Sequence, residues 1–157
     1  MKAFSFRLEP ILLLREGKRK NALASYARSI IASKELEKKL DSLNKSLGDL
    51  QKDISKQRQK VFSPSTDVPN QAAIVNLKKK IDSTNHSIQE AKANENKLRL
   101  KFLDADNALK SVSRLKEKQE SAHIEEQTSR EELALEDVIN SRSVSYTHLR
   151  AHETPLH

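Results

Sequence analysis

Histidines are the side chains in this sequence whose spacing comes nearest to that of a reactive site. His148 and His152 stand four residues apart, the spacing that places two zinc ligands on one face of a helix. His86 and His123 are isolated, and each lies among polar residues. An isolated histidine in such surroundings indicates a solvated surface side chain. We therefore interpret neither as a metal ligand or a general base.

The other groups from which enzymes build active sites are absent from the sequence or unsuitably placed. The 157-residue chain has no cysteine and only two glycines, which excludes a thiolate site and a glycine-rich phosphate loop. Acidic residues alternate with lysines, as they do on the solvated face of a helix. We expect no catalytic residue, no cofactor, no metal and no enzyme activity.

The elements that carry these residues are expected to be long helices. Charged residues make up 32% of the chain and aromatic residues 4%, and there are four prolines. Few glycines and prolines mean few turns. An interior with so few aromatic rings suits a seam between paired helices better than a compact globular core.

A heptad pattern in the second half of the chain predicts one such helix. Steps of three and four residues connect twelve positions, ten of them apolar, in an otherwise polar segment. The positions are Ile74, Leu77, Ile81, Thr84, Ile88, Ala91, Glu95, Leu98, Phe102, Ala105, Leu109 and Val112. A repeat of this kind builds a narrow apolar seam, which needs a partner helix to cover it.

The first half of the chain predicts the partner helix. Its seam runs from Leu36 to Val61 in steps of three and four, and we expect it to begin at Leu23, Ala27 and Ile30. Between Ile30 and Leu36 the pattern takes two steps of three, through Ser33, and is one residue short of a heptad. Such a deletion predicts a stammer, which overwinds the supercoil locally.

Residues 63–70 contain two prolines and predict the turn between the two helices. A short connection returns the second helix antiparallel to the first. If the hairpin is centred on this turn, the numbers of facing residues add to about 133. In that register Leu36 faces Leu98.

The predicted fold class is therefore all-α, a long antiparallel two-helix coiled-coil hairpin over residues 1–143. We expect helix one at about residues 8–62 and helix two at about residues 71–142.

The second helix is expected to outrun the first beyond about residue 128, because the two helices differ in length. The apolar residues Leu133, Leu135, Val138 and Ile139 would then have no intramolecular partner. Unpaired apolar residues at one end of a rod suggest a docking end, and a frayed helix tip is the alternative.

Residues 144–157 break the heptad pattern. Residues 144–154 resemble the translation of a transposon-type adapter used in DNA sequencing libraries. We expect residues 144–157 to be a non-native, unstructured tail. The zinc-like spacing of His148 and His152 then carries no functional weight.

The formal net charge of +7 favours acidic partners, which include nucleic acid, anionic lipid and acidic protein surfaces. Acidic residues interrupt the basic runs and aromatic stacking residues are nearly absent, so we expect no specific nucleic-acid partner. No apolar run near the start is long enough for a signal peptide or a membrane span, which predicts a cytoplasmic protein.

Several segments resemble the FliJ family of flagellar export proteins, and together they cover residues 1–143 in order. The segments are Phe4-x-Phe6-x-Leu8-x-x-Ile11-Leu12-x-Leu14-Arg15-Glu16, Ile74-x-x-Leu77-x-x-x-Ile81, Leu115-Lys116-Glu117-Lys118 and residues 131–142. They are similar to the opening of the family, to the start of its second helix and to its closing segment.

The resemblance implies a coiled coil similar to the central stalk, or γ subunit, of rotary ATPases. It also implies a non-enzymatic part of the flagellar type III export apparatus, held through its partners at the inner face of the cell membrane at the flagellar base. The implied partners are the export ATPase FliI, whose ring the terminal end of the rod enters, the export gate protein FlhA, and export chaperones.

Carried onto this sequence, the resemblance implies two partner-binding surfaces. The end that faces the ATPase ring comprises Phe4, Phe6, Leu8, Leu12, Arg15, Leu133, Leu135, Ile139 and Arg142. The surface that faces the export gate comprises Ala73, Leu77, Lys80 and Thr84.

Two other functions remain open from the sequence. One is an equivalent stalk in a virulence-type secretion system. The other is a basic coiled-coil protein that binds nucleic acid or an anionic membrane, whose binding would fall steeply with added salt.

Overall fold

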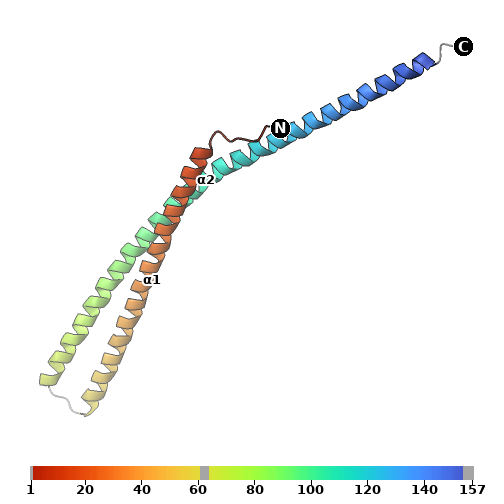
Figure 1. Ribbon diagram of the computed structural model, residues 1–157. Helices are drawn as coiled ribbons and strands as arrows, with labels where there is room; N and C mark the ends of the chain where they lie inside the picture. The colour runs from red at the N-terminus through yellow and green to blue at the C-terminus, as the bar shows by residue number, and fades with distance from the viewer. Residues whose placement is uncertain (1, 61–63, 154–157) are drawn as a thin grey trace. The chain divides into compact units, whose positions relative to one another are not determined.

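The computed structural model describes residues 2–60 and 64–153. Within these residues the chain forms two α-helices and no strand: α1 spans Glu9–Lys60 and α2 spans Pro64–Glu153 (Figure 1). The two helices pack against each other as a hairpin, which confirms the predicted fold class.

Helix α1 begins and ends with residues suited to those positions. Pro10 is the second helical residue, where a missing N–H costs no hydrogen bond. Glu9 places a carboxylate at the positive end of the helix dipole, and Arg58 and Lys60 place cations at the negative end. Val61, a predicted seam position, lies outside the described residues.

Helix α2 begins at Pro64, earlier than the expected residue 71. The first N–H groups of a helix have no intrahelical partner, so a proline can start a helix as readily as it can form a turn. Pro69 lies farther inside and removes one hydrogen bond from the helix. Asp67 in the first turn accepts hydrogen bonds from Nε and Nη2 of Arg58, at 3.0 and 2.7 Å.

Helix α2 also continues past the expected residue 142, to Glu153. Residues 144–153 are therefore helical, contrary to the expected unstructured tail, and residues 154–157 lie outside the described part. No glycine or proline occurs between Pro69 and Pro155. Extending an existing helix costs little, because each added residue gains a hydrogen bond without a new nucleation step.

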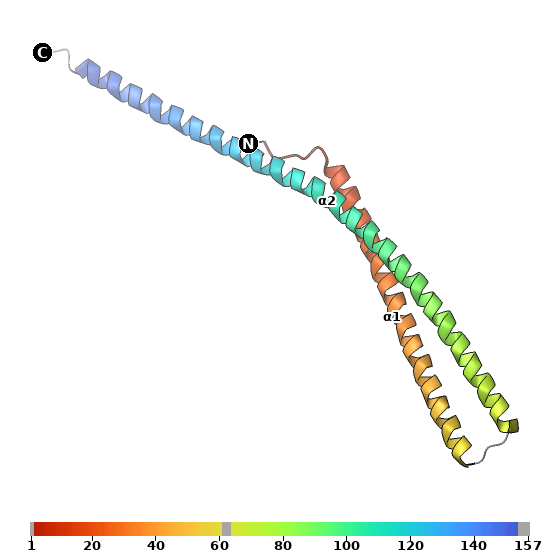
Figure 2. The same ribbon diagram turned by 180° about the vertical axis from the view of Figure 1, so that it is seen from behind.

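Packing divides the chain into two compact units. The hairpin unit is Leu14–Leu109, and the terminal unit is Met1–Leu13 with Lys110–His157. In the hairpin unit α1 and α2 lie side by side in both views (Figures 1 and 2).

The seam predicted for α2 is confirmed. All twelve of its positions are buried or half-buried, including the two polar ones, Thr84 and Glu95. A repeat sustained over this length determines which face of a helix is covered, because every apolar member supports the same phase.

The seam of α1 follows the prediction only in its second half. Each predicted position in Leu36–Ile54 is buried or half-buried. Before this stretch the prediction is wrong at Leu23 and Ala27, which are exposed, and Ser29 is buried in their place. It is confirmed at Ile30, which is half-buried, and at Ser33, which is buried.

The observed seam of α1 keeps one uninterrupted heptad repeat, so the predicted stammer is also wrong. Its earlier members are Arg15, Arg19, Ala22, Tyr26, Ser29 and Ser33. A change of phase would overwind the helix. The large apolar residues of Leu36–Ile54 set the phase, and the residues before them follow it.

Contacts across the seam place the helices about one turn away from the predicted register. Tyr26 stacks on Phe102 with ring centroids 6.3 Å apart, and Glu37 Oε1 lies 3.0 Å from Lys92 Nζ. The numbers of these facing residues add to 128 and 129, not to about 133. The difference follows from the early start of α2 at Pro64, which moves the centre of the hairpin toward the N-terminus.

Lys92 connects the two helices through carboxylates. Its Nζ also lies 3.7 Å from Glu95 Oε2. The hydrogen bond with Glu37 is the main reason that the pKa of Lys92 is raised above its ordinary value of 10.5. A raised pKa favours the charged form in the folded state. The contribution of this ion pair to stability is therefore complete below about pH 10.5 and is lost as the pH rises through the folded pKa.

Replacing Ser33 with alanine is expected to stabilise the hairpin. Ser33 is 1% exposed, and its hydroxyl has no hydrogen-bond partner within the described part of the chain. A buried unsatisfied polar group costs about 1–3 kcal/mol, and alanine also has the higher helix propensity. We expect the free energy of unfolding, measured by urea denaturation and circular dichroism, to rise by about 1 kcal/mol. The exposed control Ser46→Ala measures the propensity gain alone, and an equal rise in both variants would contradict this account.

The register can be tested at the ion pair between Arg19 Nε and Asp106 Oδ1, which are 2.7 Å apart. In the register predicted from the sequence, Arg19 would face Arg114 instead. We expect Arg19→Glu and Asp106→Arg each to lower the free energy of unfolding by about 1 kcal/mol, because each places like charges together. The double variant restores opposite charges and is expected to recover at least half of the loss. A double-mutant cycle without such recovery would refute the observed register.

Candidate docking site at the terminal end

Buried side chains lie among the N-terminal residues of the terminal unit and in the first turn of α1. Phe6 and Leu12 are 7% and 6% exposed. The Glu9 N–H donates to Phe6 O at 3.2 Å, and the Leu12 N–H donates to Leu8 O at 3.0 Å. These two hydrogen bonds join the irregular N-terminal residues to the first turn of α1.

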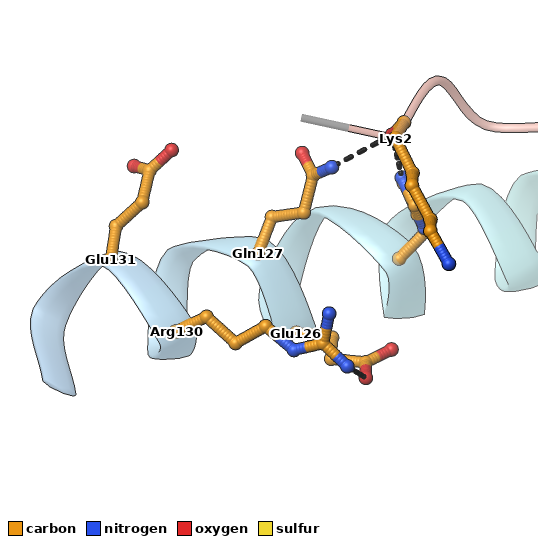
Figure 3. A pocket seen from close by; sticks show the side chains of 6 residues that line it. Lys2, Glu126, Gln127, Arg130 and Glu131 are labelled. Carbon is orange, nitrogen blue, oxygen red and sulfur yellow. Dashed lines mark hydrogen bonds and ion pairs between the residues drawn. The ribbon is translucent and has the colours of Figure 1, made fainter. Parts of the chain in front are cut away.

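Side chains of α2 bind the main chain of Lys2. Gln127 Nε2 donates to Lys2 O at 2.8 Å (Figure 3). His123 Nε2 lies 3.1 Å from the same oxygen and donates to it when the ring proton is on Nε2. The His123 ring also lies against Phe4, with ring centroids 5.6 Å apart.

His123 is half-buried at the surface, and its contacts with the N-terminal residues were not predicted from the sequence. Its partners come from the opposite end of the chain, which its neighbours in the sequence do not reveal. The heptad repeat of α2 did contain a signal, because the repeat reaches Lys116 and His123 when it is extended past Val112. Lys116 likewise faces the N-terminal residues, with its Nζ 2.9 Å from Glu9 Oε2. His86, in contrast, is highly exposed and lies beside Glu90 on its own helix.

An open groove of about 470 Å³ borders the Lys2 contact (Figure 3). It is lined by Lys2, His123, Glu126, Gln127, Arg130 and Glu131. Arg130 Nη2 is paired with Glu126 Oε1 at 2.7 Å, one helical turn away. The lining holds no serine, threonine or cysteine nucleophile. Within the described residues, no three histidine or acidic side chains are grouped so that they could hold a metal ion.

Beyond the groove, α2 is exposed on all sides. Every residue from 128 to 144 is exposed, which confirms the overhang predicted from the sequence. Leu133, Leu135, Val138 and Ile139 have exposed fractions between 49% and 61%. We call residues 128–144 the overhang.

Apolar side chains project from more than one side of the overhang. Leu135, Ile139 and Arg142 follow at steps of four and three, so they share one face of the helix. Leu133 is rotated by about 200° from Leu135, because each residue turns the helix by about 100°. A partner that surrounds the helix can cover both sides.

Among protein-family models, the one described as flagellar FliJ protein matches residues 4–145 of this chain. The chain belongs to the FliJ family. No curated protein and no solved structure matches it. Membership makes the chain a stalk-type component of flagellar protein export, within a family of structural and adaptor proteins. In the described residues, no helix has both the length and the apolarity that a membrane span requires.

The FliJ resemblance assigned nine residues to the end that faces the ATPase ring, and the structure divides them into two groups. Five are buried or half-buried within the chain: Phe4, Phe6, Leu8, Leu12 and Arg15. Arg15, in the hairpin unit, donates from Nη1 to Ala108 O at 2.8 Å. Four lie exposed on the overhang: Leu133, Leu135, Ile139 and Arg142.

The residues that the FliJ resemblance assigned to the gate-facing surface lie on α2 of the hairpin unit. Thr84 is 4% exposed and donates from its hydroxyl to Lys80 O at 2.7 Å, so its side chain belongs to the seam. Ala73 and Leu77 are half-buried, and Lys80 is exposed. Lys80 is therefore the most accessible member of this set.

Replacing Phe6 with alanine is expected to release the N-terminal residues without unfolding the hairpin unit. Truncating a buried phenylalanine costs about 3–5 kcal/mol, and a chain end can open locally. We expect faster tryptic cleavage after Arg7 and faster amide hydrogen exchange in residues 2–8, with little change in helical circular dichroism. The exposed neighbour variant Ser5→Ala is the control. Equal cleavage rates in wild type and Phe6→Ala would show that Phe6 is not the anchor.

Proposed function

We propose that this protein is a non-enzymatic stalk of the flagellar export apparatus, and that its terminal end enters the ring of the export ATPase FliI. In this role it promotes assembly of the ring and turnover of ATP. The observation that carries the proposal is the overhang: four large apolar side chains are exposed on one helix of a chain that belongs to the FliJ family. Exposed apolar groups of this size, close together, mark a site of interaction.

The form of the overhang supports a ring as the partner. A flat partner surface would cover one face of the helix and leave Leu133 or Leu135 in water, because these side chains point in nearly opposite directions. A ring encloses the helix and can bury both. Arg142, on the face of Leu135 and Ile139, provides a cation for a carboxylate of the ring.

Some of the N-terminal residues would act indirectly, because their side chains are buried within the protein. Phe6 and Leu12 are buried, so their contribution is to hold the N-terminal residues against α2. Direct contact with the ring then falls to the overhang and to the half-buried Phe4 and Leu8.

Contact with the export gate protein FlhA is proposed for the hairpin unit, around Ala73, Leu77 and Lys80. Thr84 would act indirectly, through its hydrogen bond to the Lys80 carbonyl. Export chaperones are proposed as further partners. The protein would be cytoplasmic and would be held at the membrane by these partners.

The family match supports a flagellar role over the equivalent stalk of a virulence-type secretion system, because the matching description is that of a flagellar protein.

The proposal is tested by measuring ATP hydrolysis by the cognate export ATPase with and without the full chain. We expect several-fold stimulation by the wild type. Leu135→Asp/Ile139→Asp is expected to abolish the stimulation, because carboxylates cannot be buried in an apolar contact without a large desolvation cost. Since both residues are exposed, helical circular dichroism is expected to remain unchanged.

Leu100→Asp/Leu103→Asp is the matched control, because it changes two exposed leucines of α2 outside the overhang. This variant is expected to stimulate as well as the wild type. A folded wild-type protein that changes neither ring assembly nor turnover would refute the proposed function. Equal loss in both variants would refute the assignment to the overhang.

A further inference from the structure

The outer face of α1 carries a second heptad row, opposite the seam. Steps of three and four residues connect its members, all of them exposed. They are Gly17, Lys20, Ala24, Ala27, Ile31, Lys34 and Lys38. In a two-helix coiled coil these positions face water and are usually charged or polar. Here three consecutive positions, Ala24, Ala27 and Ile31, are apolar.

Leu23 widens this row into an apolar strip. Leu23, Ala27 and Ile31 are each four residues apart and therefore lie along one face. Leu23 is 41% exposed and Ile31 is 57% exposed. On the other side of the same stretch of helix, the seam buries Ser29 and Ser33. In this stretch the fully buried seam residues are serines, Tyr26 and Ile30 are half-buried, and the large apolar side chains of Leu23 and Ile31 are exposed.

The strip has a shape that accepts another helix. Alanines occupy the centre of the strip, and small side chains allow two helix axes to approach closely. At Gly17 an added Cβ would have no atom within 4 Å, so that end of the row is open. From Lys20 to Lys38 the row is about 27 Å long, at a rise of 1.5 Å per residue, which matches about five turns of a partner helix.

The charges around the strip determine what kind of helix would fit. Lys20 precedes the apolar positions, and Lys34 and Lys38 follow them. No acidic residue occupies the row, and no ion pair of the described residues involves these three lysines. Exposed ammonium groups at both ends of an apolar strip favour carboxylates on the partner. A nucleic acid is a poorer fit, because the centre of the face is aliphatic and offers no stacking ring.

We propose that the outer face of α1, residues 17–38, binds an amphipathic helix of a partner protein, one with acidic residues at both ends of its apolar stripe. The helix would lie in the row as in other helix-in-groove complexes, with its apolar residues on Leu23, Ala27 and Ile31. This face points away from the seam, so the hairpin stays intact when the partner binds. The site is separate from the overhang and from the residues proposed for the export gate.

The test uses the full chain and two synthetic helical peptides of about three heptads. Both peptides carry the same leucines on the apolar face. One has glutamates before and after the leucine stripe, at its two ends, and the other has lysines at the same positions. In fluorescence anisotropy we expect the glutamate peptide to bind at least ~10-fold more tightly than the lysine peptide. Its affinity is expected to fall several-fold as the salt concentration is raised, because salt screens exposed charges.

Two variants test whether the peptide binds to this face of α1. The variant Leu23→Lys/Ile31→Lys is expected to bind the glutamate peptide at least ~10-fold more weakly, because it removes the apolar contact. Lys34→Glu/Lys38→Glu is expected to shift the preference toward the lysine peptide. Leu100→Lys/Leu103→Lys, which changes two exposed leucines of α2, is the control and is expected to bind like the wild type.

Equal binding of the two peptides, absence of binding, or full binding by Leu23→Lys/Ile31→Lys would overturn the proposal. Sedimentation of the protein alone provides a further check. If the protein self-associates and this variant abolishes the association, the face belongs to a second copy of the chain, and the assignment to an acidic partner helix fails.

Discussion

The phase of the heptad seam is the constraint on which the rest of the structure depends. Neither helix is apolar enough to be buried on all sides, so each needs the other to cover one narrow face. The large aliphatic side chains of the α2 seam and of the stretch Leu36–Ile54 of α1 hold that phase. Because a helix changes phase only by overwinding or unwinding, these residues also determine which face is covered farther along the chain.

This constraint explains why α1 buries serines near its start. The phase set by Leu36–Ile54 places Ser29 and Ser33 in the seam and leaves Leu23 and Ile31 outside. The hydroxyl of Ser33 has no hydrogen-bond partner within the described residues, which costs about 1–3 kcal/mol, and the helix nevertheless keeps its phase. A conflict between local pattern and overall fold is typical of residues that serve a function other than folding. Here it leaves an exposed apolar strip with lysines at both ends.

The second feature that shapes the molecule is the difference in length between the helices. Helix α1 begins at Glu9, whereas α2 extends to Glu153. The irregular N-terminal residues cover part of the excess, through Phe6 and through the bonds of His123 and Gln127 to Lys2. What remains is the overhang, a single helix with apolar side chains on more than one side. Its exposure is a direct consequence of helix length, and it makes this end suitable for a partner that encloses it.

The sequence by itself determined the all-α class, the seam of α2, the overhang and the family, because periodicity belongs to a single helix and is visible without its partner. Only the tertiary structure decided the register, the start of α2 at Pro64 and the partners of His123. Proline favours a turn and a first helical turn alike, so the centre of the hairpin depends on how the two helices meet. The register likewise depends on contacts between residues far apart in the chain. The face of α1 that is buried before Leu36 follows from the phase set by Leu36–Ile54, and the exposed apolar residues Leu23 and Ala27 obscured that phase in the sequence.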